Sequence, residues 1–137
     1  MKGIRKTNSV HKYSLGELEC IARRMAREVA APCSICLEGD VGAGKTTFSQ
    51  FFINELQEGS QQLVTSPTFN IVQVYDTTKG LVWHVDLYRI KHEEEIFELG
   101  LLEAMHEHIC LIEWPYILQS GCLKHYIENC DIKNINL

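Results

Sequence analysis

The spacing of hydrophobic residues changes several times along this chain, and each change predicts an element of secondary structure. From residue 15 to about residue 30 an apolar residue recurs every three or four positions, which is the period of a helix with one buried face. The sequence Ser14–Glu17 fits a capping box that starts a helix, and Pro32 follows its expected end. We therefore expect the first helix over residues 15–30.

Short apolar runs then predict strands. The first run, Ser34–Leu37, leads through a glycine-rich loop into a helical pattern over residues 47–56. Residues 71–75 and 81–86 are two apolar stretches joined by the turn-forming residues 76–80, which is typical of a β-hairpin.

In the second half of the chain, hydrophobic spacing typical of helices is again followed by a continuous apolar run typical of a strand. Glu93–Leu99 is expected to form a short acidic helix ended by Gly100, and a second short helix is expected over residues 101–107. Ile109–Glu113 has the continuous apolar character of a strand buried on both faces. The tail offers one further strand over residues 125–132. This order of elements predicts an α/β fold with a mostly parallel central sheet flanked by helices and one antiparallel hairpin.

Length and composition limit the classes of protein that fit. The chain has 137 residues, enough for one domain with one core, and we expect residues 1–137 to form it. Hydrophobic residues make up 45% and charged residues 23%, and no apolar run approaches the roughly 20 residues that span a membrane. The basic start has no apolar signal core after it, so a cytoplasmic location is expected. The net charge of −5 argues against a strong independent grip on nucleic acid.

The glycine-rich loop carries the most specific chemical signal. Gly39–Thr46 fits the P-loop pattern G-x-x-x-x-G-K-[ST], with a strand expected before it and a helix after it. The glycines let backbone N–H groups approach a phosphate, and the helix adds its positive end. Lys45 is expected to reach the β- and γ-phosphates, and the Thr46 hydroxyl to ligate Mg²⁺. The sequence therefore predicts an ATP and Mg²⁺ site in a P-loop NTPase-like fold.

Two carboxylates are expected near this loop. Asp86 ends the returning hairpin strand and shares a strand face with His84. Glu113 ends the apolar strand that Trp114 then stops, which resembles a Walker B element. Strand-end carboxylates are a normal way to hold Mg²⁺ in P-loop proteins. A satisfied polar pair at Asp86 and a solvent-facing Glu113 are the alternatives.

Three other groups of residues have weaker signals. Cys33-x-x-Cys36 invites a zinc or redox interpretation, but residues three apart in a strand point to opposite faces, so ordinary thiols are favoured. The hydroxyls of Thr65, Ser66 and Thr68 are candidate ligands for phosphate, metal or water, although the segment also fits a common turn. The remaining group lies on the first helix, and it is either a solvated face or a docking surface for an acidic or RNA-containing partner: Arg23, Arg24 and Arg27.

Together these residues resemble the TsaE family, small P-loop ATPases required for threonylcarbamoyladenosine modification of tRNA. The shared signature extends from Gly39 to Pro115, and a P-loop followed by four further blocks is far more specific than a P-loop alone. The blocks are Glu38–Phe48, Ser66–Phe69, His84–Arg89, Leu99–Leu101 and Ile112–Pro115.

The resemblance implies a bacterial cytoplasmic subunit that hydrolyses ATP and acts with the proteins TsaB and TsaD, meeting tRNA only through that complex. It implies phosphate binding by residues 42–47, catalytic roles for Lys45, Asp86 and Glu113, and Mg²⁺ held by Thr46, Asp86 and Glu113. Trp114 is expected close to the nucleotide, and the segment around Ser14 near the adenine. The residues implied to bind the nucleotide are Ser14, Gly42, Ala43, Gly44, Lys45, Thr46, Thr47 and Trp114.

Three other functions fit parts of the sequence. A small-molecule kinase needs a lid with several basic residues, but Arg89 is the only arginine after the P-loop. A GTPase switch needs a guanine-reading Asn-Lys-x-Asp sequence, which this chain does not contain. A nucleotide-dependent adaptor that docks on partners without hydrolysis has no sequence feature that separates it from an ATPase.

Overall fold

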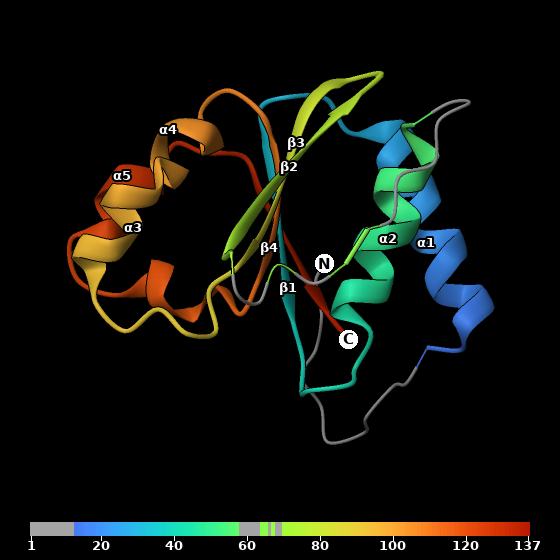
Figure 1. The fold of residues 1–137 in the computed structure, drawn as a ribbon, viewed down its shortest axis with the longest axis horizontal. Helices are drawn as coiled ribbons and strands as arrows, with labels where there is room; N and C mark the ends of the chain where they lie inside the picture. The colour runs from blue at the N-terminus through green and yellow to red at the C-terminus, as the bar shows by residue number, and fades with distance from the viewer. Residues whose placement is uncertain (1–12, 58–63, 66, 68–69) are drawn as a thin grey trace.

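The computed structural model of the chain describes residues 13–57, 64–65, 67 and 70–137. In this part of the chain five strands form one sheet in the order β2-β3-β4-β1-β5 (Figure 1). The β2–β3 pair is antiparallel, and the other neighbours are parallel. This confirms the predicted α/β fold with a mostly parallel sheet and one hairpin. The strands are β1 (Cys33–Glu38), β2 (Val72–Thr77), β3 (Gly80–Asp86), β4 (Ile109–Glu113) and β5 (Ile132–Asn136).

Helices cover both faces of the sheet. In Figure 1 α1 and α2 lie on one side, and α3, α4 and α5 lie on the other. None of the helices that the structure describes is both long and apolar enough to cross a lipid bilayer. The helices are α1 (Leu15–Glu28), α2 (Lys45–Glu55), α3 (Glu93–Leu99), α4 (Leu101–Met105), the 3-10 helix η1 (Pro115–Gln119) and α5 (Leu123–Ile127).

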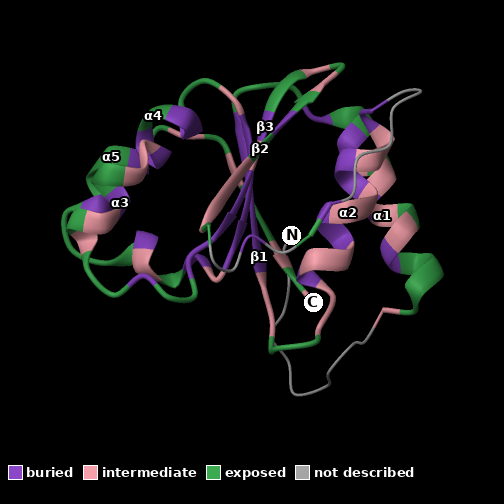
Figure 2. Cartoon of the chain, viewed as in Figure 1, coloured by how far each residue is buried: buried purple, intermediate pink, exposed green. Residues whose placement is uncertain are grey.

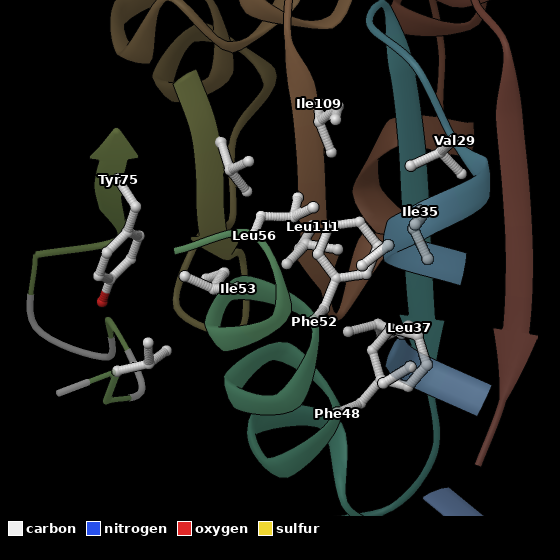
Figure 3. Close-up of a cluster of buried hydrophobic side chains, with 14 of the residues drawn as sticks. Val29, Ile35, Leu37, Phe48, Phe52, Ile53, Leu56, Tyr75, Ile109 and Leu111 are labelled. Atoms are coloured by element: carbon white, nitrogen blue, oxygen red, sulfur yellow. The ribbon is translucent and has the colours of Figure 1, made fainter. Parts of the chain in front are cut away.

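The sheet separates two apolar cores, and β4 contributes to both. Ile109 and Leu111 pack towards α1 and α2, whereas Cys110 and Ile112 pack towards α3, α4 and α5. Every residue of β4 is buried, and Figure 2 shows burial along the central strands. On the first face Phe48 and other α2 side chains lie against the sheet (Figure 3). The continuous apolar run of β4 therefore reflects a strand covered on both sides.

Several element boundaries differ from the prediction, most of them by one or two residues. The first helix ends at Glu28 rather than at residue 30, because Val29 is extended and caps it. The predicted strand over residues 125–132 is wrong, since residues up to Ile127 are helical and β5 begins at Ile132. Leu123 and Ile127 are buried four residues apart, which is helical spacing, while β5 is held at the sheet edge mainly by backbone pairing with β1.

The turn of the β2–β3 hairpin ties the sheet to both helices of the first face. The Lys79 ammonium donates hydrogen bonds to the backbone oxygens of Ala26 and Arg27, both at 2.8 Å, and also to that of Val29. The Thr78 N–H donates to Leu56 O at 2.9 Å, just after α2. Lys79 thus satisfies carbonyl groups that the end of α1 leaves open, where a cation is also favoured by the helix dipole.

Substitution of Lys79 by methionine should lower the free energy of unfolding by about 1–2 kcal/mol, because it removes charge-assisted hydrogen bonds at a helix C-terminus. Urea denaturation measures this as a lower midpoint with an unchanged slope. Lys91→Met is the matched control, since Lys91 is exposed and should change the midpoint little. Equal midpoints for the two variants would show that the Lys79 contacts contribute nothing.

Candidate functional site

The topology brings three strand ends to one edge of the sheet. β4 pairs in parallel with β1 and with β3, so their carboxyl ends lie together. In this register Glu113 pairs with both Leu37 and Asp86. Paired residues share a face, and Leu37 packs in the core beneath α1 and α2. Asp86 and Glu113 therefore lie on the face that α2 covers, beside the start of that helix.

The glycine-rich loop between β1 and α2 adopts a backbone that its glycines make possible. Gly42 and Gly44 have φ angles of 82° and 110°, in the left-handed region that favours glycine. A Cβ atom on Gly44 would also lie 3.1 Å from Leu18 Cδ2 of α1. Ala43 N–H donates to Asp40 O at 3.0 Å and closes the loop. The first turn of α2 follows at once, so its free N–H groups face the loop.

Lys45 is a buried cation at this helix start. It is 5% exposed, and its Nζ donates to the backbone oxygens of Gly39 at 2.6 Å and Asp40 at 2.8 Å. Burial lowers the pKa of Lys45, and the negative charges of Glu113 and Asp86 oppose that shift. The loop thus holds the ammonium group in place before any ligand arrives.

Glu113 contacts the first turn of α2 through its carboxylate. It is 3% exposed, and its two carboxylate oxygens lie 3.3 and 3.2 Å from Thr46 Oγ1, which donates to them. The Nε2 atom of His84 lies 2.7 Å from Glu113 Oε2. A buried carboxylate is unfavourable without such partners. Glu113 is therefore held between a hydroxyl and an imidazole, and its carboxylate does not face solvent.

Asp86 is fixed through its backbone and its side chain. Its N–H donates to Ile71 O at 2.9 Å, and its Oδ1 accepts from Tyr88 N–H at 3.0 Å. The second contact is an Asx-type turn that holds the carboxylate at the end of β3. Asp86 is buried and faces the same cavity as Glu113.

These groups line a cavity of ≈ 270 Å³. Two carboxylates and a hydroxyl supply the hard oxygen ligands that Mg²⁺ prefers. Backbone N–H groups and an ammonium suit a phosphate. The donor set therefore fits a magnesium–phosphate group. The cavity is lined by Val41, Gly42, Gly44, Lys45, Thr46, Thr47, Asp86, Glu113 and Trp114.

Trp114 forms an aromatic wall of the cavity. Its φ of 58° is left-handed, which is uncommon outside glycine and turns the chain sharply after β4. The indole ring centre lies 4.1 Å from Lys45 Nζ, within cation–π range. The rings of Tyr88 and Tyr116 lie 4.9 and 6.2 Å from that of Trp114. The sequence does not predict these ring contacts, because nothing local to either tyrosine shows which rings meet.

Most of the residues expected at the site line this cavity together. Two of them do not: Ala43 lies within the loop, and Ser14 caps α1 by accepting from Glu17 N–H at 3.1 Å. His84 shares a strand face with Asp86, and its ring makes a hydrogen bond to Glu113 of the neighbouring strand β4. Thr65 is not a lining residue, and Ser66 and Thr68 lie outside the described residues.

The remaining sequence candidates have structural roles. Cys33 and Cys36 lie in opposite cores, as their spacing predicts. Burial raises the pKa of Cys36 to about 12, so its thiol is a weak nucleophile. Arg23 and Arg27 of α1 both donate to Glu55 of α2, at 3.0 and 3.1 Å, and lower the pKa of that carboxyl. Two of the three arginines therefore join the helices.

Comparisons with known proteins identify one family of relatives. The model of the family described as threonylcarbamoyl adenosine biosynthesis protein TsaE matches residues 13–136. The tRNA threonylcarbamoyladenosine biosynthesis protein TsaE of Rickettsia prowazekii is 41% identical over 112 residues, which are 82% of this chain and 77% of that protein. The protein of the same name from Bacillus subtilis is 38% identical over 105 residues, 76% of this chain and 64% of the relative.

A solved structure is similar as well. The crystal structure of Bacillus subtilis YdiB matches with a TM-score of 0.59 and 32% identity, covering 78% of this chain and 64% of that one. This chain therefore spans about three quarters of the Rickettsia prowazekii relative and less than two thirds of the two Bacillus subtilis chains.

Substitution of Gly44 by alanine should lower the free energy of unfolding by about 1–3 kcal/mol, because alanine is strained at this φ and its Cβ meets Leu18. Thermal or urea unfolding measures the loss. Gly16→Ala is the matched control: it lies in α1 with nothing within 4 Å of the added Cβ. That variant should be neutral or more stable by up to about 1 kcal/mol. Equal behaviour of the two variants would contradict a required left-handed Gly44.

Proposed function

The chain belongs to the TsaE family, and we propose that it binds ATP with Mg²⁺ and hydrolyses ATP in support of tRNA threonylcarbamoyladenosine biosynthesis. The observation that carries the proposal is the meeting of Lys45, Thr46 and Glu113 at one cavity. A phosphate-binding loop, a buried ammonium and a metal-type ligand set are the parts that phosphoryl chemistry needs. The names of the relatives support the pathway.

The loop residues 42–47 bind the phosphates in this proposal. Their backbone N–H groups donate to phosphate oxygens, and Lys45 places a positive charge beside the β- and γ-phosphates. Because Gly39 O and Asp40 O already hold the ammonium, little reorganisation is needed when ATP enters. Trp114 lies beside the Lys45 ammonium, and we propose that its ring shields the phosphate oxygens from water.

Thr46, Asp86 and Glu113 would hold the metal, directly or through water. A bound Mg²⁺ supplies positive charge that stabilises the phosphate oxygens during hydrolysis. Glu113 additionally orients the attacking water and accepts its hydrogen bond at a carboxylate oxygen. The burial of Glu113 supports this role, because a desolvated carboxylate interacts more strongly with a nearby donor.

The small number of basic side chains at the cavity suggests that partners complete the site. Among the described lining residues Lys45 is the one basic side chain. P-loop ATPases commonly gain from an arginine that a partner brings. We propose that TsaB and TsaD stimulate turnover and that tRNA contacts the assembly through them. The same shortage of basic lining residues disfavours a small-molecule kinase.

A non-hydrolysing, nucleotide-dependent adaptor is the second candidate. The exposed Tyr88, Tyr116 and Val41 lie at or beside the cavity rim and suit docking on a partner when nucleotide is bound. Hydrolysis is what separates this function from the first. Turnover in the assembled complex therefore decides between them.

Substitution of Lys45 by alanine should weaken ATP binding by roughly 10–100-fold, since a charge-assisted hydrogen bond contributes about 1.5–3 kcal/mol. Isothermal titration calorimetry with ATP and Mg²⁺ measures the affinity. Lys124→Ala, at an exposed position of α5, is the control and should bind as the unmodified chain does. Unchanged affinity in Lys45→Ala would mean that ATP binds elsewhere.

Steady-state hydrolysis should be slow for the chain alone and rise ~10³-fold or more with TsaB and TsaD, as expected for a charge supplied in trans. Glu113→Gln, nearly isosteric and uncharged, should keep the nucleotide affinity measured without Mg²⁺ and lose at least ~10-fold in turnover, since one misplaced contact is worth a kcal/mol or more. Equal turnover with and without partners would refute the stimulation. Normal turnover in Glu113→Gln would remove this residue from the mechanism.

A further inference from the structure

His84 is a buried titratable side chain that the proposed mechanism does not use. It lies in β3, has no exposed surface and does not line the cavity. Its ring meets the carboxylate to which we assign the attacking water, with 2.7 Å between His84 Nε2 and Glu113 Oε2. Both partners are almost free of solvent contact. A polar contact of this kind is strong in a dry environment and costly to leave unmade.

The contact fixes which ring nitrogen carries the hydrogen. An ionised carboxylate oxygen only accepts hydrogen bonds, so Nε2 must donate. The other ring nitrogen, Nδ1, is buried and has no hydrogen-bond partner among the described residues. A ring with its hydrogen on Nε2 therefore suits this position, because it places its donor at Glu113 and leaves no buried N–H at Nδ1.

The contact also fixes the direction of the carboxylate. Thr46 Oγ1 approaches Glu113 from the start of α2, and His84 approaches it from β3. The parallel register pairs His84 with Leu111, two residues before Glu113 on the same face. The imidazole thus contacts the carboxylate from β3, on the sheet face that α2 covers, while Thr46 lies at the cavity. The carboxylate is therefore held by partners from two separate elements.

We propose that His84 is a positioning residue, whose Nε2–H holds the Glu113 carboxylate at the orientation in which it faces Thr46 and the cavity. The proposal rests on the proposed function, because it takes the role of Glu113 from there. Outer-shell hydrogen bonds of this type orient metal-binding side chains, and their loss typically lowers metal affinity or activity by about 10–100-fold.

A matched pair of amide variants separates positioning from packing. The side-chain nitrogen of glutamine reaches about as far from the backbone as Nε2, whereas that of asparagine reaches only about as far as Nδ1. His84→Gln should therefore keep the donor to Glu113, and His84→Asn should lose it. In the complex with TsaB and TsaD, His84→Asn should lower turnover by about 10–100-fold, while His84→Gln stays within a few-fold of the unmodified chain.

A second measurement does not depend on catalysis. Calorimetry with a non-hydrolysable ATP analogue, with and without Mg²⁺, gives the part of the affinity that the metal contributes. His84→Asn should reduce that part by about 10-fold or more and leave the metal-free affinity unchanged. A packing role alone predicts lower melting temperatures in both variants with turnover and metal dependence preserved, and that result would overturn the proposal.

Nitrogen-15 NMR of the imidazole in the nucleotide-free chain tests the contact itself, even if both variants fail to fold. The expected spectrum shows hydrogen on Nε2 and none on Nδ1. Hydrogen on Nδ1 with a bare Nε2 would overturn the proposal whatever the protein does with ATP. If the spectrum shows the expected tautomer but the chain binds no ATP, the hydrogen bond stands. The proposed function is then overturned, and the positioning role that rests on it is overturned as well.

Discussion

The parallel pairing of β4 with both β1 and β3 is the constraint on which the rest of the structure depends. It places the loop after β1 and the carboxylates of Asp86 and Glu113 at one edge of the sheet. Because side chains alternate between faces, a slip of one residue in β4 would turn Glu113 away from α2 and into the opposite core. The apolar residues Ile109–Ile112 oppose that slip, since each core buries alternate members of the run.

The same edge concentrates charge where water is scarce. Lys45, Asp86 and Glu113 are all buried, and each is held by a hydrogen bond to a neighbouring group. Desolvation of such groups is unfavourable, and the fixed partners offset it. What the chain gains is preorganisation: donors and acceptors are already aimed, so little rearrangement is needed when a charged ligand enters. Burying these charged groups thus lowers the stability of the fold, and apolar packing in the two cores offsets that loss.

The sequence predicts local features of this protein better than contacts between distant segments. Gly39–Thr46 and the run ending at Glu113 are local patterns, and Gly42, Gly44, Lys45, Thr46 and Glu113 from them line the cavity. The partnership of His84 with Glu113 is not local, because it depends on the relative shift of β3 and β4. The strand predicted over residues 125–132 is wrong for a related reason. β5 is held by backbone pairing with β1, which leaves only a weak pattern of side chains in the sequence. Register and edge pairing are properties of the assembled sheet.

The two tryptophans of the chain lie in contrasting surroundings. The indole of Trp114 forms the cavity wall and lies against the Lys45 ammonium, whereas Trp83 packs towards the opposite core and stacks on His108. Indole fluorescence responds to nearby charge and to water around the ring. A ligand that fills the cavity changes both for Trp114 and neither for Trp83. The molecule therefore contains an optical reporter of its own site together with an internal reference that the site does not reach.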